Sequence, residues 1–140
     1  MNMYEMCLLH ARSDRVLRGS IAAHLEESQI TMMEWLLLGV IAKGSSKGVN
    51  MSDIAEALHV TLPQVTALVN KLLPLKLVRQ KSANTDRRSR LVTLTNKGEV
   101  VLGEASKILD TARSKLLEEL SQEDLDGYTK TLQKIIASGI

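Results

Sequence analysis

Apolar side chains recur at helical spacing near the start of the chain and predict one long helix over about residues 3–27. The positions that form this stripe are Met6, Leu9, Val16, Leu17, Ile21 and Leu25. Farther on, Thr31 and Glu34 have the spacing of a capping box, in which each side chain pairs with a free backbone N–H of the other residue. The almost wholly apolar segment "WLLLGVIAK" follows, so we expect a helix there in the centre of the core.

Two short helices are predicted next, after a "GSSKG" loop and a very short strand at "VNM". Ser52 stands where it would cap the first helix, "DIAEALHV". Thr61 and Gln64 form a capping box for the second, and Pro63 falls in its first turn, where a missing N–H does no harm. Pro74 should end that helix. A turn of about three residues separates the two helices, which is the spacing of a helix-turn-helix.

Strand-like segments come after this pair. "LVRQK" and "RLVTL" are rich in β-branched and aliphatic residues, and the polar "SANTDRRS" between them predicts a β-hairpin with a long loop. Helical spacing returns at Asn96, where Asn96 and Glu99 are placed to form a cap, and Ser121 would cap a last helix. The apolar stripes of these two helices are Leu102, Ala105, Leu109, Ala112 and Leu116, then Leu125, Tyr128, Leu132, Ile135 and Ile136. The predicted fold class is mainly α with a small β-hairpin wing: a winged helix-turn-helix flanked by N- and C-terminal helices.

Composition narrows the class of protein. A chain of 140 residues is expected to form one domain, and 44% hydrophobic residues with only 2% aromatic ones predict an aliphatic core. No apolar run reaches the ~18 residues of a membrane span, and the N-terminus does not resemble a signal peptide, so we expect a cytoplasmic protein without membrane contact. The single cysteine excludes an internal disulfide and cysteine-cluster metal sites.

Charge is distributed unevenly along the chain. The formal net charge is only +2, yet residues 76–97 hold seven basic side chains and one acidic one, Asp86. The rest of the chain has 11 basic and 15 acidic residues. A basic block on an otherwise acidic chain indicates contact with a polyanion more specifically than the overall charge does.

The order of predicted elements and one long segment resemble the MarR (multiple antibiotic resistance regulator) family of transcription factors over nearly the whole chain. The most specific portion is "VTLPQVTALVNKLLPLKLVRQKSANTDRRSRLVTLTNKG". Within it, "DRRSRLVTLTNKG" resembles the family's wing, its following strand, and the Leu-Thr-x-x-Gly that opens the long dimerisation helix, here Leu94, Thr95 and Gly98.

This resemblance implies a homodimer that binds a roughly palindromic site in double-stranded DNA. Residues 31–95 would form the DNA-binding lobe, and residues 3–28 and 96–140 the dimerisation helices. The recognition helix, from Thr61 to about Leu73, would enter the major groove. Asp86 and Arg88 match the family's Asp-x-Arg pair in the wing, where the arginine enters the minor groove and the aspartate steadies it.

The sequence departs from the family pattern at two positions. Many relatives have a glycine where Lys76 stands, at the exit from the recognition helix, and a basic residue where Ala67 stands. The major-groove contacts are therefore expected to rely more on Gln64, Asn70 and Lys71.

The candidate DNA-binding residues lie in the second short helix and the hairpin. They are Thr61, Gln64, Thr66, Asn70, Lys71, Arg79, Asp86, Arg87, Arg88, Ser89 and Arg90. Hydroxyl and amide groups can hydrogen-bond to base edges, whereas lysine and arginine suit phosphates and the negative potential of the minor groove. Two plainer interpretations remain open: Thr61 as a helix cap alone, and the basic loop as a solvated hairpin tip.

Other side chains suggest a ligand or a redox site. Met6, Met32, Met33 and Trp35 could line a small-molecule effector pocket, as the resemblance implies, with core packing as the alternative. Cys7 lies where some hydroperoxide-sensing relatives keep a reactive cysteine, but a buried or interface thiol is the favoured interpretation. The histidines form no convincing metal site, and no cofactor is expected.

The sequence therefore predicts a dimeric DNA-binding transcriptional regulator, more specifically a repressor whose DNA affinity responds to a ligand. The alternatives are a winged-helix protein-interaction module that does not bind DNA, and a cysteine-based redox-sensing regulator. An enzyme is not expected, because the chain has no glycine-rich phosphate loop, nucleophile elbow or metal-ligand spacing.

Overall fold

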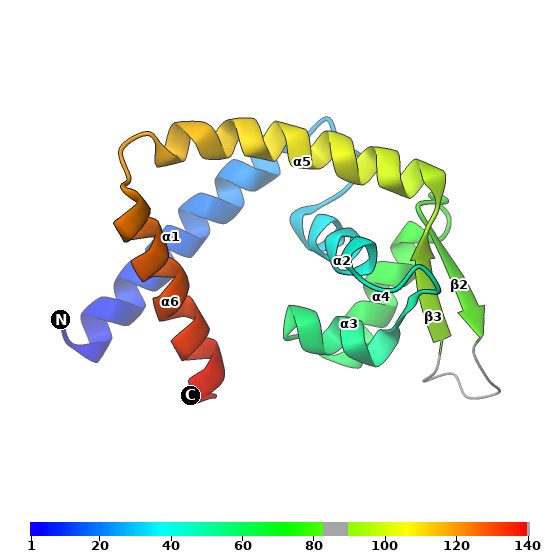
Figure 1. The fold of residues 1–140 in the computed structure, drawn as a ribbon, viewed down its shortest axis with the longest axis horizontal. Helices are drawn as coiled ribbons and strands as arrows, with labels where there is room; N and C mark the ends of the chain where they lie inside the picture. The colour runs from blue at the N-terminus through cyan, green and yellow to red at the C-terminus, as the bar shows by residue number, and fades with distance from the viewer. Residues whose placement is uncertain (83–89, 140) are drawn as a thin grey trace. The chain divides into compact units, whose positions relative to one another are not determined.

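A computed structural model of the protein describes residues 1–82 and 90–139. In these residues it has six helices and three strands, which confirms the predicted fold class (Figure 1). The elements are α1 (Met3–His24), α2 (Met32–Lys43), β1 (Val49–Asn50), α3 (Met51–Leu58), α4 (Leu62–Leu72), β2 (Val78–Ser82), β3 (Arg90–Leu94), α5 (Asn96–Leu117) and α6 (Gln122–Ser138).

The three strands form one antiparallel sheet in the order β1-β3-β2. Strand β3 lies in the middle, with Leu94 opposite Val78 of β2 and Val92 opposite Val49 of β1. Val92 is fully buried, because its side chain points from the central strand into the core. The hairpin and the very short first strand predicted from the sequence are both confirmed.

The hydrophobic core lies among α2, α3, α4 and the sheet. Leu37 and Leu38 of α2 are fully buried, as expected for the central apolar helix. On α4, Val65, Val69 and Leu72 are fully buried, and Leu68 is half-buried against the same core. Burial of large aliphatic side chains contributes roughly 1.5–3 kcal/mol each and is the main force that holds α4 on this lobe.

Three helices have N-terminal capping boxes at the residues where the sequence predicted their caps. Thr31 with Glu34 caps α2, Thr61 with Gln64 caps α4, and Ser121 caps α6 with Asp124 as its partner. Each box satisfies backbone N–H groups that have no partner within the helix.

Three boundaries differ from the prediction. Asn50, not Ser52, caps α3, because its side chain accepts a hydrogen bond from the Asp53 N–H at 2.8 Å. Helix α5 is capped by Thr95 rather than by Asn96 and Glu99: the Thr95 hydroxyl accepts from the Gly98 N–H at 2.9 Å. Helix α1 ends at His24, short of the predicted residue 27.

The chain divides into two compact units, Met1–Leu109 and Asp110–Ile140. Helix α1, within the first unit, contains no buried residue, and neither does α6 in the second. Both helices expose large apolar side chains, namely Met3, Tyr4, Leu8, Leu9, Val16 and Leu17 in α1, and Tyr128, Ile135 and Ile136 in α6. Among the residues that the structure describes, no helix is long and apolar enough to cross a membrane.

Candidate nucleic-acid interface

Helix α4 has one face in the core and the opposite face in solvent. Its inner face is held by the fully buried Val65, Val69 and Leu72. The exposed side chains include those of Thr61, Gln64, Thr66, Ala67, Asn70 and Lys71. All predicted contact residues of this helix therefore lie on the surface, which a recognition helix requires.

The turn between α3 and α4 fixes the angle between the two helices. His59 caps α3 in the left-handed region, with φ of 56°. The Val60 N–H donates to the carbonyl of Ala55 at 3.0 Å, and the His59 N–H donates to that of Glu56 at 3.1 Å. This pair of bonds is a Schellman motif, in which a left-handed residue closes the end of a helix.

Two polar side chains of α4 are already engaged within the helix. The Gln64 Oε1 accepts from the Thr61 N–H at 2.9 Å and from the Thr61 hydroxyl at 3.1 Å. The Thr66 hydroxyl donates to the Leu62 carbonyl at 3.0 Å. Thr61 is thus a helix cap, and its hydroxyl also orients Gln64.

A second Schellman motif forms the exit from α4. The Leu77 N–H donates to the Leu72 carbonyl at 3.3 Å, and the Lys76 N–H donates to the Leu73 carbonyl at 3.0 Å. Lys76 has φ of 59°, a left-handed conformation that favours glycine. The position where many relatives have glycine therefore has the same backbone requirement here, and lysine meets it with strain.

The start of α5 clamps this exit turn. Thr95 donates its N–H to the Leu77 carbonyl at 3.1 Å and its hydroxyl to the Lys76 carbonyl at 2.6 Å. The Lys97 ammonium donates to the Leu75 carbonyl at 3.1 Å. Gly98 lies so close that a Cβ atom there would overlap the Leu77 carbonyl oxygen. The "LTNKG" segment thus joins the end of the recognition helix to the start of α5.

The basic hairpin is described only in part. Arg79 on β2 is exposed. Arg90, at the start of β3, is half-buried, and its Nη1 donates to the Gln80 Oε1 at 3.3 Å across the hairpin. The remaining predicted wing residues, Asp86, Arg87, Arg88 and Ser89, lie outside the described residues.

The predicted effector residues lie on two helices, Met6 on α1 and the other three on α2. Met6, Met32, Met33 and Trp35 are all half-buried, and the Trp35 Nε1 donates to the Ser106 hydroxyl of α5 at 3.1 Å. This bond indicates that Trp35 packs α2 against α5. Core packing, the alternative left open by the sequence, therefore accounts for the tryptophan.

Cys7 is exposed in the single chain. The interpretation of a thiol buried within the chain is therefore wrong, whereas an interface thiol stays a prediction. Over residues 1–82 and 90–139, no group of three or more His, Cys, Asp or Glu side chains is placed to hold a metal ion.

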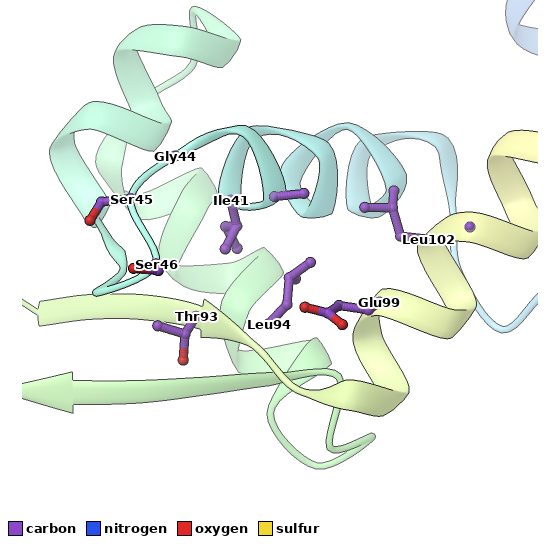
Figure 2. Close-up of a pocket in the computed structure, with 10 residues that line it drawn as sticks. Ile41, Gly44, Ser45, Ser46, Thr93, Leu94, Glu99 and Leu102 are labelled. Atoms are coloured by element: carbon purple, nitrogen blue, oxygen red, sulfur yellow. The ribbon is translucent and has the colours of Figure 1, made fainter.

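A pocket that the sequence did not predict lies elsewhere in the first unit. It has a volume of about 520 Å³ and is lined by Ile41, Ala42, Gly44, Ser45, Ser46, Thr93, Leu94, Glu99, Leu102 and Gly103. Figure 2 shows the Glu99 carboxylate and the Leu94 side chain in the space between β3, the end of α2 and the start of α5. Sequence spacing could not reveal this pocket, because its walls come from three separate segments of the chain.

The chain resembles known regulators in sequence and in fold. Residues 28–89 match the sequence profile of the MarR family. MepR of S. aureus, solved as a complex with DNA, superposes with a TM-score of 0.82 at 26% identity, over 95% of this chain and 96% of MepR. AbsC, a MarR family transcriptional regulator from Streptomyces coelicolor, superposes with a TM-score of 0.84 at 23% identity, over 99% of this chain and 95% of AbsC.

CouR, a transcriptional repressor, has the same fold. Bound to a 23-mer DNA duplex, it superposes with a TM-score of 0.83 at 23% identity, over 97% of this chain and 98% of CouR. CouR from Rhodococcus jostii RHA1 has also been solved with p-coumaroyl-CoA. Residues 28–89 thus match the MarR family profile, and the chain shares its fold, over almost its whole length, with solved regulators of that family.

Proposed function

We propose that the protein binds double-stranded DNA sequence-specifically, as a homodimer on a pseudo-palindromic operator. The observation that carries this proposal is the polar outer face of α4, which presents Gln64, Asn70 and Lys71 to solvent. The core behind this helix and the clamp at its exit hold it rigidly, and preorganised side chains are what base readout needs. MepR and CouR, which share the fold, were both solved with DNA.

The proposed contacts divide by chemistry. Thr61, Gln64, Thr66 and Asn70 would hydrogen-bond to bases or phosphates, while Lys71 and Arg79 would contact phosphates and set the register of the dimer. The hairpin residues Asp86, Arg87, Arg88, Ser89 and Arg90 would act at the minor groove, as the resemblance implies.

The exposed apolar side chains of the terminal helices support a homodimer. Helices α1 and α6 are 22 and 17 residues long, and neither has a buried residue in the single chain. Large exposed apolar faces on a globular protein mark an interaction site, and a second copy of the same chain would cover both helices. In this proposal residues 3–28 and 96–140 form the dimer, and residues 31–95 read the DNA.

The regulator is further proposed to be a ligand-responsive repressor. Two half-sites one DNA turn apart, about 34–36 Å, are engaged together only when the two recognition helices have a matching separation. A small molecule that binds better to another separation would lower the affinity for DNA by population shift. The pocket of about 520 Å³ offers a site for it, because its walls join β3 to α2 and α5. Met6, Met32, Met33 and Trp35 remain a second candidate site.

A salt series of DNA binding tests the proposal. The full-length protein is titrated onto a duplex from the promoter of its own gene and onto a scrambled duplex. We expect preference for the promoter, and Arg88→Ala and Lys71→Ala should each weaken binding and reduce the salt slope by about one per lost contact. Lys43→Ala, at an exposed position of α2 that is not among the proposed contacts, is the matched control and should change neither quantity. Equal affinity for both duplexes, or wild-type affinity after Arg88→Ala, would favour a protein-interaction module instead.

A further inference from the structure

The carbonyl oxygen of Gln64 is fully engaged within its own helix. A carbonyl oxygen has two lone pairs, and here one faces the Thr61 N–H at 2.9 Å and the other the Thr61 hydroxyl at 3.1 Å. The amide of Gln64 is therefore oriented by its hydrogen bonds, with the oxygen toward Thr61. Its NH₂ group is left as the part of this exposed side chain that is available to DNA.

We propose that Gln64 is a specificity-determining residue that reads DNA only as a hydrogen-bond donor. This inference rests on the proposed function, because it assigns a base preference to the same recognition helix. A donor fits base edges that present acceptors in the major groove: guanine offers two, N7 and O6, thymine offers O4, and adenine offers only N7 beside its N6 amino donor. Glutamine usually reads adenine with its oxygen and its nitrogen together, and that mode is closed here.

The capping box keeps the Gln64 oxygen from accepting a hydrogen bond from adenine. To accept from the adenine N6 amino group, the Gln64 oxygen would have to leave Thr61. The Thr61 N–H would then lose its partner at a helix terminus, while the interface excludes the water that could replace it. Readout of adenine through both the oxygen and the nitrogen of Gln64 would thus cost hydrogen bonds that readout of guanine keeps.

Asn70 provides an internal contrast on the same helix. It is also exposed, and within the described part of the chain no hydrogen bond holds its amide. Asn70 is therefore free to offer both its oxygen and its nitrogen, which is the arrangement that suits adenine. Two amides on one helix are thus expected to differ in the bases that they select.

The substitution Gln64→Glu replaces the NH₂ group, a hydrogen-bond donor that is available to DNA, with a carboxylate oxygen, which is an acceptor. In Gln64→Glu one oxygen can keep the bonds from Thr61, as Glu34 does in the capping box of α2 and Asp124 in that of α6. The second oxygen replaces the outward donor with an acceptor. Asn70→Asp places the same added negative charge on the same helix at a position without this constraint, and it is the matched control.

The experiment selects bound duplexes from a random double-stranded DNA pool with the full-length wild type and both variants. The wild type should enrich guanine, or thymine, at one position of each half-site. Gln64→Glu should lose that preference and shift toward cytosine, whose N4 group is a donor, with about tenfold or more weaker binding to the wild-type site. Asn70→Asp should weaken binding but keep the wild-type base at the Gln64 position.

Other outcomes would contradict either the donor-only role of Gln64 or the proposed function itself. If Gln64→Glu selects the wild-type bases at every position, the donor-only role is wrong while sequence-specific binding stands. If the wild type enriches no sequence, the proposed function fails and this inference falls with it. Thermal melts separate these cases from misfolding, because Gln64→Glu should melt as the wild type does.

Discussion

The winged lobe buries its apolar side chains within the single chain, whereas the terminal helices leave theirs exposed. The buried apolar residues of the described chain all lie between Leu25 and Leu109, in the lobe, in the segment just before it and in α5. Helices α1 and α6 have none, although both have apolar stripes. The lobe thus carries its own core, whereas the terminal helices have apolar side chains that are exposed in the single chain. The DNA-reading surface and the proposed dimer surface should therefore respond differently to mutation.

The largest expected effect is on assembly. Leu9 on α1 is 56% exposed in the single chain, and Leu9→Asp would place a charge in the proposed dimer interface. We expect loss of the dimer and of tight operator binding, while the lobe keeps its fold. Analytical ultracentrifugation and near-UV circular dichroism measure the two properties.

Ala57→Asp is the control for this charge. It adds the same carboxylate at an exposed position of α3, outside the residues of the proposed dimer interface. It should leave the mass of the assembly unchanged. If Leu9→Asp sediments as the wild type does, α1 does not contribute its apolar face to a dimer.

The second prediction concerns the join between the lobe and α5. Gly98→Ala would drive a Cβ atom into the Leu77 carbonyl oxygen, so the backbone has to shift. We expect the free energy of unfolding to fall by about 1–3 kcal/mol, the usual cost of overpacking. Gly103→Ala on the same helix meets no atom within 4 Å and should be neutral or stabilising. Urea denaturation of the pair tests this, and equal stability of the two variants would contradict the close approach.

The exit turn of α4 should yield a smaller, stabilising change. Lys76 has a left-handed backbone, which costs a non-glycine residue about 1–2 kcal/mol, while glycine costs about 0.5–1 kcal/mol in chain entropy. Lys76→Gly is therefore expected to raise the free energy of unfolding by about 1 kcal/mol or less. Lys76→Ala removes the same charge but keeps the strain, so it should not stabilise. Parallel urea melts compare the two, and a gain from alanine equal to that from glycine would point to charge instead.

Sequence reasoning succeeded where local signals agree. The boxes at Thr31 and Thr61 each depend on two residues three positions apart, and the structure confirms both. It failed for the cap of α3, where Asn50 and Ser52 are both good cap residues. The pairing of β1 with β3 ends the strand at Asn50 and so makes Asn50 the cap, a choice that only tertiary structure can make.

In the candidate site, too, the features that depend on local sequence could be predicted, and those that depend on tertiary structure could not. The outward position of Gln64, Asn70 and Lys71 follows from helical periodicity, and the structure places all three on the surface. The clamp by Thr95 and Lys97 on the exit turn joins residues about 20 positions apart, so no local pattern reveals it. The wing residues Asp86 to Ser89 lie outside the described chain, and their role stays a prediction.

The smallest expected effect returns to the terminal helices, at the cap of α6. The Ser121 N–H and hydroxyl donate to the Asp124 carboxylate at 2.9 and 2.8 Å, and these bonds hold the pKa of Asp124 below its ordinary value of 3.8. Because the folded pKa is the lower one, the ionised carboxylate stabilises the cap above pH 3.8. This contribution is lost as the pH falls through the folded pKa.

Titration of Asp124 by NMR, with far-UV circular dichroism of the same samples, measures the effect. Asp124→Asn is the control, and its helix content should be independent of this titration. Wild type and variant should therefore converge only at acid pH, below the folded pKa. If the Asp124 carboxyl titrates at or above its ordinary pKa, the box does not hold α6 in solution. The capping box of α4 pairs Thr61 with Gln64, whose side chain is uncharged, so it has no carboxylate to lose to protonation. Acid should therefore weaken the cap of α6 and leave the cap of α4 in place.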